Sequence, residues 1–152
     1  MPEHYPTIFN KTTGEIVQSG FFSCSEESVQ ANFEARMSVY DPATYSCVDA
    51  QSDSSLHYVA VVRGEPVVVS RQNMRITIKD GKTTLVANGT DTVQLTGLPD
   101  PCTIVQDPGE PEETSYEVTG GGFVFSAETP GKYQFRVDRF PFLPFSIEFT
   151  AT

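Results

Sequence analysis

The second half of the chain alternates apolar and polar residues over short segments, and this pattern constrains the fold most strongly. In the first such segment Met74, Ile76 and Ile78 are apolar and the residues between them are polar. A period of two places the apolar side chains on one face of a β-strand. The pattern recurs up to the last residues, and turn-forming pairs such as Asn88–Gly89 and Pro130–Gly131 separate the segments. It predicts seven or eight short strands in a β-sandwich or barrel.

A tyrosine near the C-terminus narrows this prediction to an immunoglobulin-like sandwich. In that architecture a tyrosine near the start of the sixth strand turns its hydroxyl back onto the preceding corner, two residues before a buried core position. The sequence offers Tyr133 for the corner and Phe135 for the core position. Val93 or Leu95 is the expected partner of Phe135 from the second strand. The chain has no Trp, so its core departs from that of antibody domains.

The first half of the chain contains two predicted hairpins. One joins Ile8–Phe9 to Ile16–Val17 through a polar connection that contains a glycine. The other joins residues 56–62 to residues 65–70 across Arg63–Gly64. The strands of the second hairpin are rich in valine, so both of its faces are expected to be partly buried. A second copy of the chain or another protein is one way to bury them.

Between the two hairpins the pattern predicts little regular structure. A single helix is expected from about Glu26 to Glu34, with Val29 and Phe33 on its buried side. A short strand is expected at residues 37–40, and the polar stretch 46–55 shows no helical period. The fold class is therefore mainly β: a small β-rich unit with one short helix, followed by the sandwich. The change of pattern places the boundary between domains 1–72 and 73–152.

The charge of the chain excludes several classes of partner. Twenty acidic residues against ten basic ones give a net charge of −10, which opposes binding to nucleic acid or to anionic lipid. No apolar run approaches the ~20 residues of a membrane span, and the N-terminal residues lack the pattern of a secretory signal. We therefore expect synthesis in the cytoplasm, with no nucleic-acid partner and no membrane insertion.

The residues with catalytic or ligating chemistry are few. Three Cys without a Cys-x-x-Cys pair and two His favour neither a disulfide framework nor a metal site, so no cofactor or metal is expected. His57 is the one plausible catalytic histidine, and Cys24 has no basic neighbour to activate its thiol. The acidic loop 107–113 suits either a hard cation or water. The chain is not expected to be an enzyme.

Two series of residues carry a resemblance to known proteins. The series Gly-Gly-Phe-x-Phe, then Pro-Gly-x-Tyr-x-Phe-x-Val-x-x-Phe-Pro-Phe, resembles bacterial-type immunoglobulin-like domains of virion and surface proteins. In the first half, Thr-Gly-x-Ile followed by His-Tyr-Val and Gly-Glu-Pro is similar to short domains of tailed-bacteriophage tail and tail-fibre-associated proteins. This resemblance implies a structural role in a phage virion, without catalytic residues.

Two apolar segments are the predicted contact surfaces. The first is the valine-rich hairpin, and the second is the segment Arg139–Phe145, which places apolar side chains between two prolines. The second segment either folds over the end of the sandwich or docks on a partner with aromatic anchors. The predicted interface residues are Tyr58, Val59, Val67, Val69, Phe140, Phe142 and Leu143.

These observations favour an accessory tail or tail-fibre attachment protein of a tailed-phage virion. The first unit would dock on other virion proteins and the second would project or brace a neighbour, with many copies or a homo-oligomer strengthening each contact. One alternative is a decoration or cement protein of the phage head. Another is a module that binds a host receptor or surface glycan, for which Tyr40, Tyr45 and Tyr58 are the candidate sugar platform. A hydrolase is the last alternative.

Overall fold

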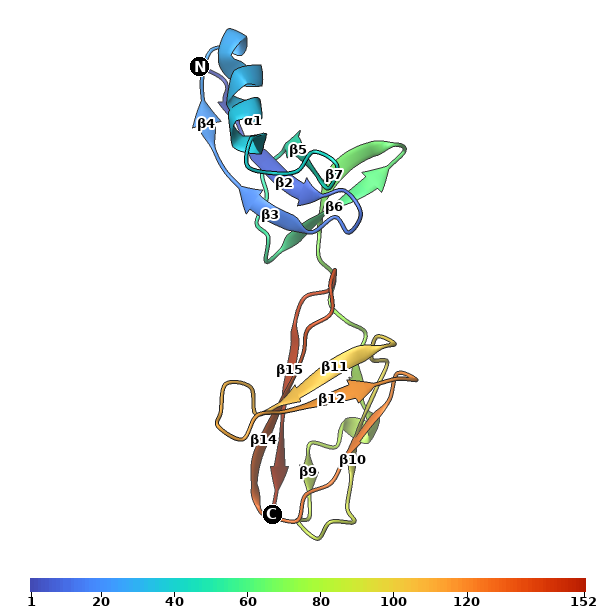
Figure 1. The fold of residues 1–152 in the computed structure, drawn as a ribbon. Coiled ribbons are helices and arrows are strands. Elements are labelled where there is room, and N and C mark those ends of the chain that lie inside the picture. Colours follow the sequence, from blue (N-terminus) through green and yellow to red (C-terminus); the bar gives the residue numbers. More distant parts are fainter. The chain divides into compact units, whose positions relative to one another are not determined.

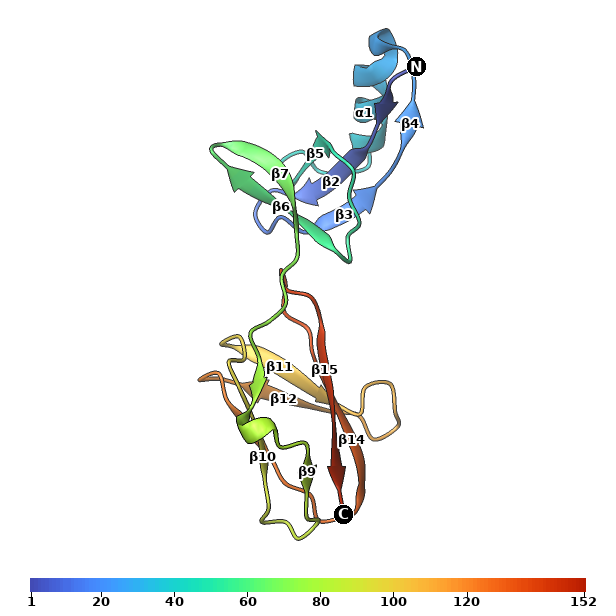
Figure 2. The same ribbon diagram turned by 180° about the vertical axis from the view of Figure 1, so that it is seen from behind.

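The chain forms two units, Met1–Arg71 and Gln72–Thr152, in the computed structural model, which describes residues 1–152 (Figures 1 and 2). Both units are built mainly of β-strands, as the sequence predicted. No helix in the structure has the length and apolar character that a membrane span requires.

The first unit contains three small antiparallel sheets and one α-helix. In the central sheet, strand β2 lies between its two neighbours, and each of the other sheets has two strands. The three sheets consist of β3 (Ile16–Ser19), β2 (Pro6–Asn10) and β5 (Tyr45–Asp49); of β1 (Glu3–His4) and β4 (Phe22–Ser23); and of β6 (His57–Val62) and β7 (Glu65–Ser70).

Both predicted hairpins are confirmed. The first pairs β2 with β3 antiparallel, with a register shift between Ile8 and Phe9. The second pairs β6 with β7 in continuous register from His57 opposite Ser70 to Val62 opposite Glu65. Arg63 and Gly64 both have positive φ, at 52° and 83°. This is the conformation of the two-residue turns that match the twist of a hairpin.

The predicted strand at residues 37–40 is wrong, because the helix continues into this segment. A 3₁₀ turn at Glu26–Ser28 leads into helix α1 (Val29–Met37), which ends three residues beyond the expected end. Residues 34–37 are all good helix formers, and the first chain breaker is the later pair Asp41–Pro42. Val29 and Phe33 are half-buried rather than fully buried.

The sequence did not predict strand β5, which begins just before the polar stretch 46–55. This strand pairs with β2 from Pro6 opposite Asp49 to Asn10 opposite Tyr45. Main-chain hydrogen bonds to a central strand therefore hold β5 in place, without the apolar alternation that would have marked it as a strand.

A close approach of two main chains attaches the second hairpin to the first. The N–H of Val59 donates to the carbonyl oxygen of Gly14 across 2.9 Å. Gly14 has a φ of +77°, and a Cβ atom placed there would lie 2.1 Å from the carbonyl oxygen of Val59. Only glycine fits this position. The contact lies beside the small core of the unit, which consists of Phe9, Ile16 and Val59 with Val48 and Val68 packed against it.

The second unit contains eight strands in two sheets, within the range that the alternation predicted. One sheet has three strands in the order β13, β10, β8, and the other has five strands in the order β12, β11, β14, β15, β9. Their bounds are β8 (Thr77–Ile78), β9 (Thr84–Leu85), β10 (Val93–Thr96), β11 (Cys102–Gln106), β12 (Thr114–Val118), β13 (Phe123–Phe125), β14 (Gly131–Val137) and β15 (Phe145–Ala151), with a 3₁₀ turn at Lys79–Gly81.

This strand order is that of an immunoglobulin-like sandwich. Strands β11, β14 and β15 are neighbours as C, F and G are in that fold, and β10 and β13 form the opposite sheet as B and E do. Phe135 is fully buried in a core that also contains Val93, Leu95 and Phe149. The tyrosine corner is present too, because the hydroxyl of Tyr133 donates to a main-chain carbonyl four residues upstream.

Candidate interaction surface

The two faces of the β6–β7 hairpin have different environments. Residues opposite each other in an antiparallel pair point to the same face. The pair Val59 and Val68 therefore faces the small core of the first unit. We call the opposite side the outer face of the hairpin; it carries Tyr58, Ala60, Val62, Glu65, Val67 and Val69.

The outer face is apolar, and its tip is exposed. Val62 and Val67 retain 47% and 40% of their accessible surface, and the side chains of Ala60 and Val69 are half-buried. Val61, next to the turn on the other side of the hairpin, is 69% exposed. Of the six residues on this face, only Glu65 carries a formal charge at pH 7. Val62 and Val67 are therefore the exposed apolar residues of the outer face near the turn.

Only part of the predicted contact surface lies on this face. Tyr58, Val67 and Val69 belong to the outer face. Val59 lies instead in the core, with 5% of its surface exposed. Successive side chains of a strand point to opposite faces, and in β6 both faces are apolar. The sequence therefore does not show which of these residues face the core.

The predicted contact residues of the second unit lie in the loop between β14 and β15. The side chain of Phe142 packs against the sandwich core, and Phe140 and Leu143 are half-buried. The N–H of Leu143 donates to the carbonyl oxygen of Gln72 across 2.9 Å. The loop therefore lies over the end of the sandwich. A cavity of about 460 Å³ next to it is lined by residues 72–75, Gly97, Pro99 and Phe142.

The surroundings of His57 do not have the geometry of a catalytic relay. His57 Nδ1 accepts a hydrogen bond from the main-chain N–H of Asp53 at 3.0 Å. The hydroxyl of Ser55 donates to the carboxylate of Asp53 at 2.6 Å rather than to the histidine. This bond, together with one from the Ser55 N–H, lowers the pKa of Asp53. In a serine-type triad the histidine would accept the serine proton and the carboxylate would bind Nδ1.

The cysteines are all unpaired. Burial raises the pKa of the thiols of Cys47 and Cys102, which disfavours the reactive thiolate form. Cys24 is half-buried. Cys102 belongs to the core of the second unit, and Cys47 is half-buried.

The acidic loop directs two of its carboxylates to its own main chain or to the adjacent strand. Asp107 accepts the N–H of Gln134 at 3.0 Å, and Glu113 accepts the N–H of Gly109 at 2.7 Å. An open cavity of about 450 Å³ beside the loop is lined by Asp107, Glu110, Pro111, Glu112, Lys132, Gln134 and Glu148. No group of three or more His, Cys, Asp or Glu side chains in the chain is placed to hold a metal ion.

Two of the three tyrosines suggested as a sugar platform contact each other. The rings of Tyr40 and Tyr45 meet edge to face, with centroids 5.3 Å apart, and the hydroxyl of Tyr40 donates to Gln18 at 2.8 Å. Tyr58 lies on the hairpin, on a different sheet. The three rings therefore do not share one surface of parallel aromatic faces.

A cluster that the sequence did not reveal joins the N-terminus to helix α1. The ring of His4 stacks on Phe22 at 5.2 Å, and Phe22 meets Phe33 edge to face at 5.3 Å. His4 Nδ1 lies 2.6 Å from a carboxylate oxygen of Asp49. Burial raises the pKa of Asp49, but hydrogen bonds from His4 and from the Tyr5 N–H outweigh this effect and lower it overall. Since these residues are distant in the sequence, no local pattern marks them.

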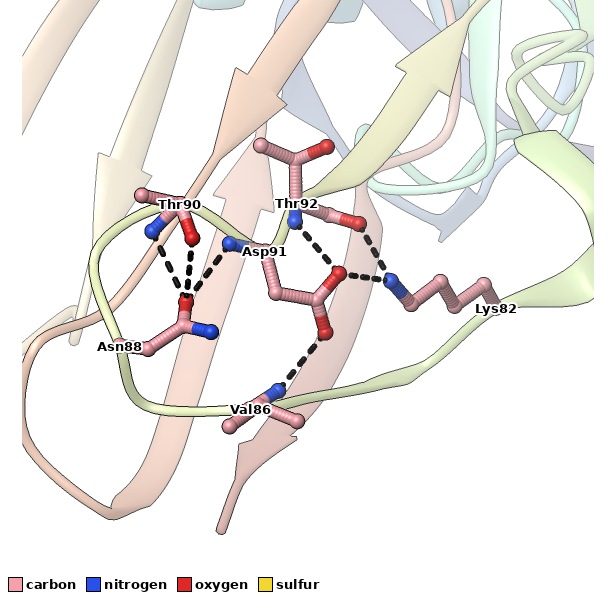
Figure 3. Close-up of polar contacts among 6 residues, drawn as sticks. All are labelled: Lys82, Val86, Asn88, Thr90, Asp91 and Thr92. Carbon is pink, nitrogen blue, oxygen red and sulfur yellow. Dashed lines mark hydrogen bonds and ion pairs between the residues drawn. The ribbon is translucent and has the colours of Figure 1, made fainter.

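A polar network closes the loop between β9 and β10 (Figure 3). The carboxylate of Asp91 accepts hydrogen bonds from the Lys82 ammonium, from the N–H of Val86 at 2.8 Å and from the N–H of Thr92 at 3.0 Å. Asn88 Oδ1 accepts the N–H groups of Thr90 and Asp91. These bonds lower the pKa of Asp91, with the bond from Lys82 as the largest cause. These groups hydrogen-bond to one another and to the main chain between Lys82 and Thr92, so the network stabilises this part of the second unit.

Comparison with known proteins assigns no family to the chain. No family model matches the sequence, and no curated protein sequence matches it. Two solved structures of glycosyl hydrolase family 2 members from Bacteroides cellulosilyticus are weakly similar. The first has a TM-score of 0.35 and 13% identity over 97% of this chain and 21% of its own. The second has a TM-score of 0.34 and 13% identity over 96% and 23%. The chain spans about a fifth of the length of these enzymes, and similarity at this level carries no argument about activity.

Proposed function

We propose that this chain is a non-enzymatic structural component of a tailed-phage virion, an accessory tail or tail-fibre attachment protein. The observation that carries the proposal is the apolar outer face of the β6–β7 hairpin, which ends in the exposed residues Val62 and Val67. The resemblance of the hairpin sequences to tail-associated domains supports the same role. The chain would be made in the host cytoplasm and carried in the virion.

The hairpin is suited to docking because it would lose little conformational entropy on binding a partner. Its exposed apolar side chains near the turn are valines, which have few rotamers to lose, although Arg63 and Glu65 are exposed there too. The Gly14–Val59 contact and the small core fix the hairpin to its unit before any partner arrives. A preformed apolar surface of this kind loses less entropy on binding than a flexible one.

The second unit would act as a spacer or brace. Its aromatic and aliphatic side chains are gathered in one closed core between two sheets. A contact of modest strength, repeated at each copy around a symmetric particle, becomes strong through avidity. The proposed partners of the outer face are therefore other virion proteins.

The proposal is tested by replacing one residue of the outer face. Val67→Lys places a charge on the docking surface. Because Val67 is 40% exposed, the lysine can reach water in the free chain and the hairpin should still fold. Burying an unpaired charge in an apolar contact is costly, so we expect about tenfold fewer copies per purified particle. The matched control is Val124→Lys, at a 56% exposed strand position of the second unit. Quantitative mass spectrometry of both sets of particles measures the effect, and equal occupancy would refute docking through this face.

A further inference from the structure

The cavity beside the loop between β14 and β15 has the size and the lining of a small-molecule site. Its volume of about 460 Å³ falls within the ~300–1,000 Å³ range of ligand pockets. Met74, Pro99 and Phe142 give the cavity apolar walls, and Asn73 and Arg75 add polar groups. Ligand pockets combine an apolar lining with a small number of polar groups in this way.

Main-chain contacts within the second unit hold the walls of this cavity in place. The N–H of Leu143 donates to the carbonyl oxygen of Gln72 across 2.9 Å, and a parallel β-bridge joins Leu143 to Asn73. Gly97 has a φ of +74°, and a Cβ atom placed there would lie 2.2 Å from the carbonyl oxygen of Arg75. The segments that carry Gly97 and Arg75 are therefore packed main chain against main chain. A preformed cavity of this kind loses little entropy when a ligand enters.

Arg75 is the only residue with a formal charge among those that line the cavity. It is exposed, and its guanidinium forms no hydrogen bond or ion pair within the chain. Arg136 of the same unit, by contrast, is paired with Asp138 at 2.6 Å. The five N–H donors of the Arg75 guanidinium are therefore available to a ligand in the cavity.

We propose that this cavity binds a small organic carboxylate. The carboxylate would lie on Arg75, because a planar guanidinium matches a carboxylate through two parallel N–H···O bonds. The side-chain amide of Asn73 is exposed and has no partner in the chain, so it can donate to the same group. The apolar body of the ligand would pack against Met74, Pro99 and Phe142. The inference goes beyond the proposed function and requires no virus particle.

The lining disfavours other classes of ligand. A cation would meet the charge of Arg75 in a cavity without a carboxylate, since Asp100 follows Pro99 in the sequence but does not line the cavity. An inorganic anion would leave the apolar walls in contact with water, whereas an apolar body removes them from it. The net charge of −10 opposes the approach of any anion, but physiological salt screens exposed charges beyond about 8 Å.

Three probes with the same apolar body test the ligand class on the purified full chain: phenylbutyrate, phenylbutanol and phenylbutylamine. An NMR titration would follow the main-chain amides of residues 72–75 and of Gly97. Phenylbutyrate should shift these signals and bind about tenfold more tightly than phenylbutanol, because only the acid pairs with the guanidinium. The absence of shifts with phenylbutyrate up to its solubility limit would overturn the proposal. Equal binding of the acid and the alcohol, or tighter binding of the amine, would do the same.

Arg75→Gln tests the role of the guanidinium, because it removes the charge and keeps a long polar side chain. Phenylbutyrate should bind this variant about tenfold more weakly than the unchanged chain, while phenylbutanol should bind both equally. The matched control is Arg63→Gln, at an exposed arginine in the turn of the β6–β7 hairpin. This control loses the same charge outside the cavity and should bind both probes as the unchanged chain does. Equal losses in the two variants would indicate a general charge effect and refute a contact with Arg75.

Asn73→Phe tests where the apolar body lies. Asn73 is exposed and joins Leu143 through its main chain, so the larger side chain should let the unit fold and fill the cavity. This variant should lose the binding of both the acid and the alcohol. Undiminished binding of either probe would show that the ligand lies elsewhere and refute the site. Failure of these titrations leaves particle occupancy unaffected, so the two proposals are tested separately.

Discussion

The hydroxyl of Tyr133 donates a hydrogen bond to the carbonyl oxygen of Thr129 across 2.7 Å. This bond fixes the corner that leads into β14, two residues before the fully buried ring of Phe135. Phe135 in turn contacts the rings of Phe123, Phe125 and Phe149. One side-chain bond therefore sets the entry of a central strand into the core of the second unit.

Tyr133→Phe should destabilise the second unit by about 1 kcal/mol, the usual net value of a hydrogen bond. Amide hydrogen exchange of the core strands in the full chain measures the change. Tyr116→Phe is the control, because the Tyr116 hydroxyl bonds to the side chain of Gln106 on an exposed strand pair rather than to a corner. An equal loss of stability in both variants would show that the corner hydrogen bond contributes no more than an ordinary surface hydrogen bond.

Gly14→Ala should destabilise the first unit more than Gly64→Ala. Both residues have positive φ, which costs an L-residue roughly 1–2 kcal/mol. At Gly14 the new Cβ would also lie 2.1 Å from the carbonyl of Val59, whereas nothing lies within 4 Å at Gly64. Urea unfolding followed by circular dichroism compares the two variants. Similar midpoints would mean that the Gly14–Val59 contact is not tight in solution.

Phe142→Ala should lower the free energy of unfolding of the second unit by about 1–2 kcal/mol, less than the ~3–5 kcal/mol expected for the fully buried Phe135. The reason is that the half-buried Phe142 ring packs on the core from one side. Hydrogen exchange of β14 and β15 would report both losses. A stable Phe142→Ala protein that fails to assemble would instead assign this side chain to a partner contact.

The Asp91 network should make the second unit sensitive to acid. Since the pKa of Asp91 is lowered below its ordinary value of 3.8, its contribution to stability is complete above that pH and is lost as the pH falls through the lower folded value. Asp91→Asn should therefore reduce the stability at pH 6 and flatten its decline below about pH 4. Urea midpoints at pH 6 and pH 3 test this, with Asp80→Asn as the control. A decline as steep as that of the unchanged chain would contradict the assignment.

The sequence predicted those elements whose signals are local. Arg63–Gly64 between two valine-rich runs marks a hairpin, and the spacing of Tyr133 and Phe135 marks an immunoglobulin-like strand. Strand β5 escaped prediction because its place depends on main-chain bonds to β2, which lies some 40 residues away in the sequence. The helix end was misplaced because nothing between Glu34 and Met37 favours a strand over continued helix.

The sequence predicted only part of the exposed apolar face of the hairpin, for a related reason. Val59 and Val67 have the same side chain and belong to the same hairpin, yet they lie on opposite faces. Val59 packs with Phe9 and Ile16, which come from the first hairpin, so the face that is buried depends on contacts distant in the sequence. A continuous apolar run carries no information about that choice.

The composition of purified particles tests the central claim most directly. Under the proposed function, virus particles from cells that produce this chain would be purified through two density gradients and analysed by quantitative mass spectrometry. The account predicts the chain at a fixed, reproducible number of copies per particle, in constant ratio to the major structural proteins. A chain that stays in the lysate and is absent from infectious particles would contradict it.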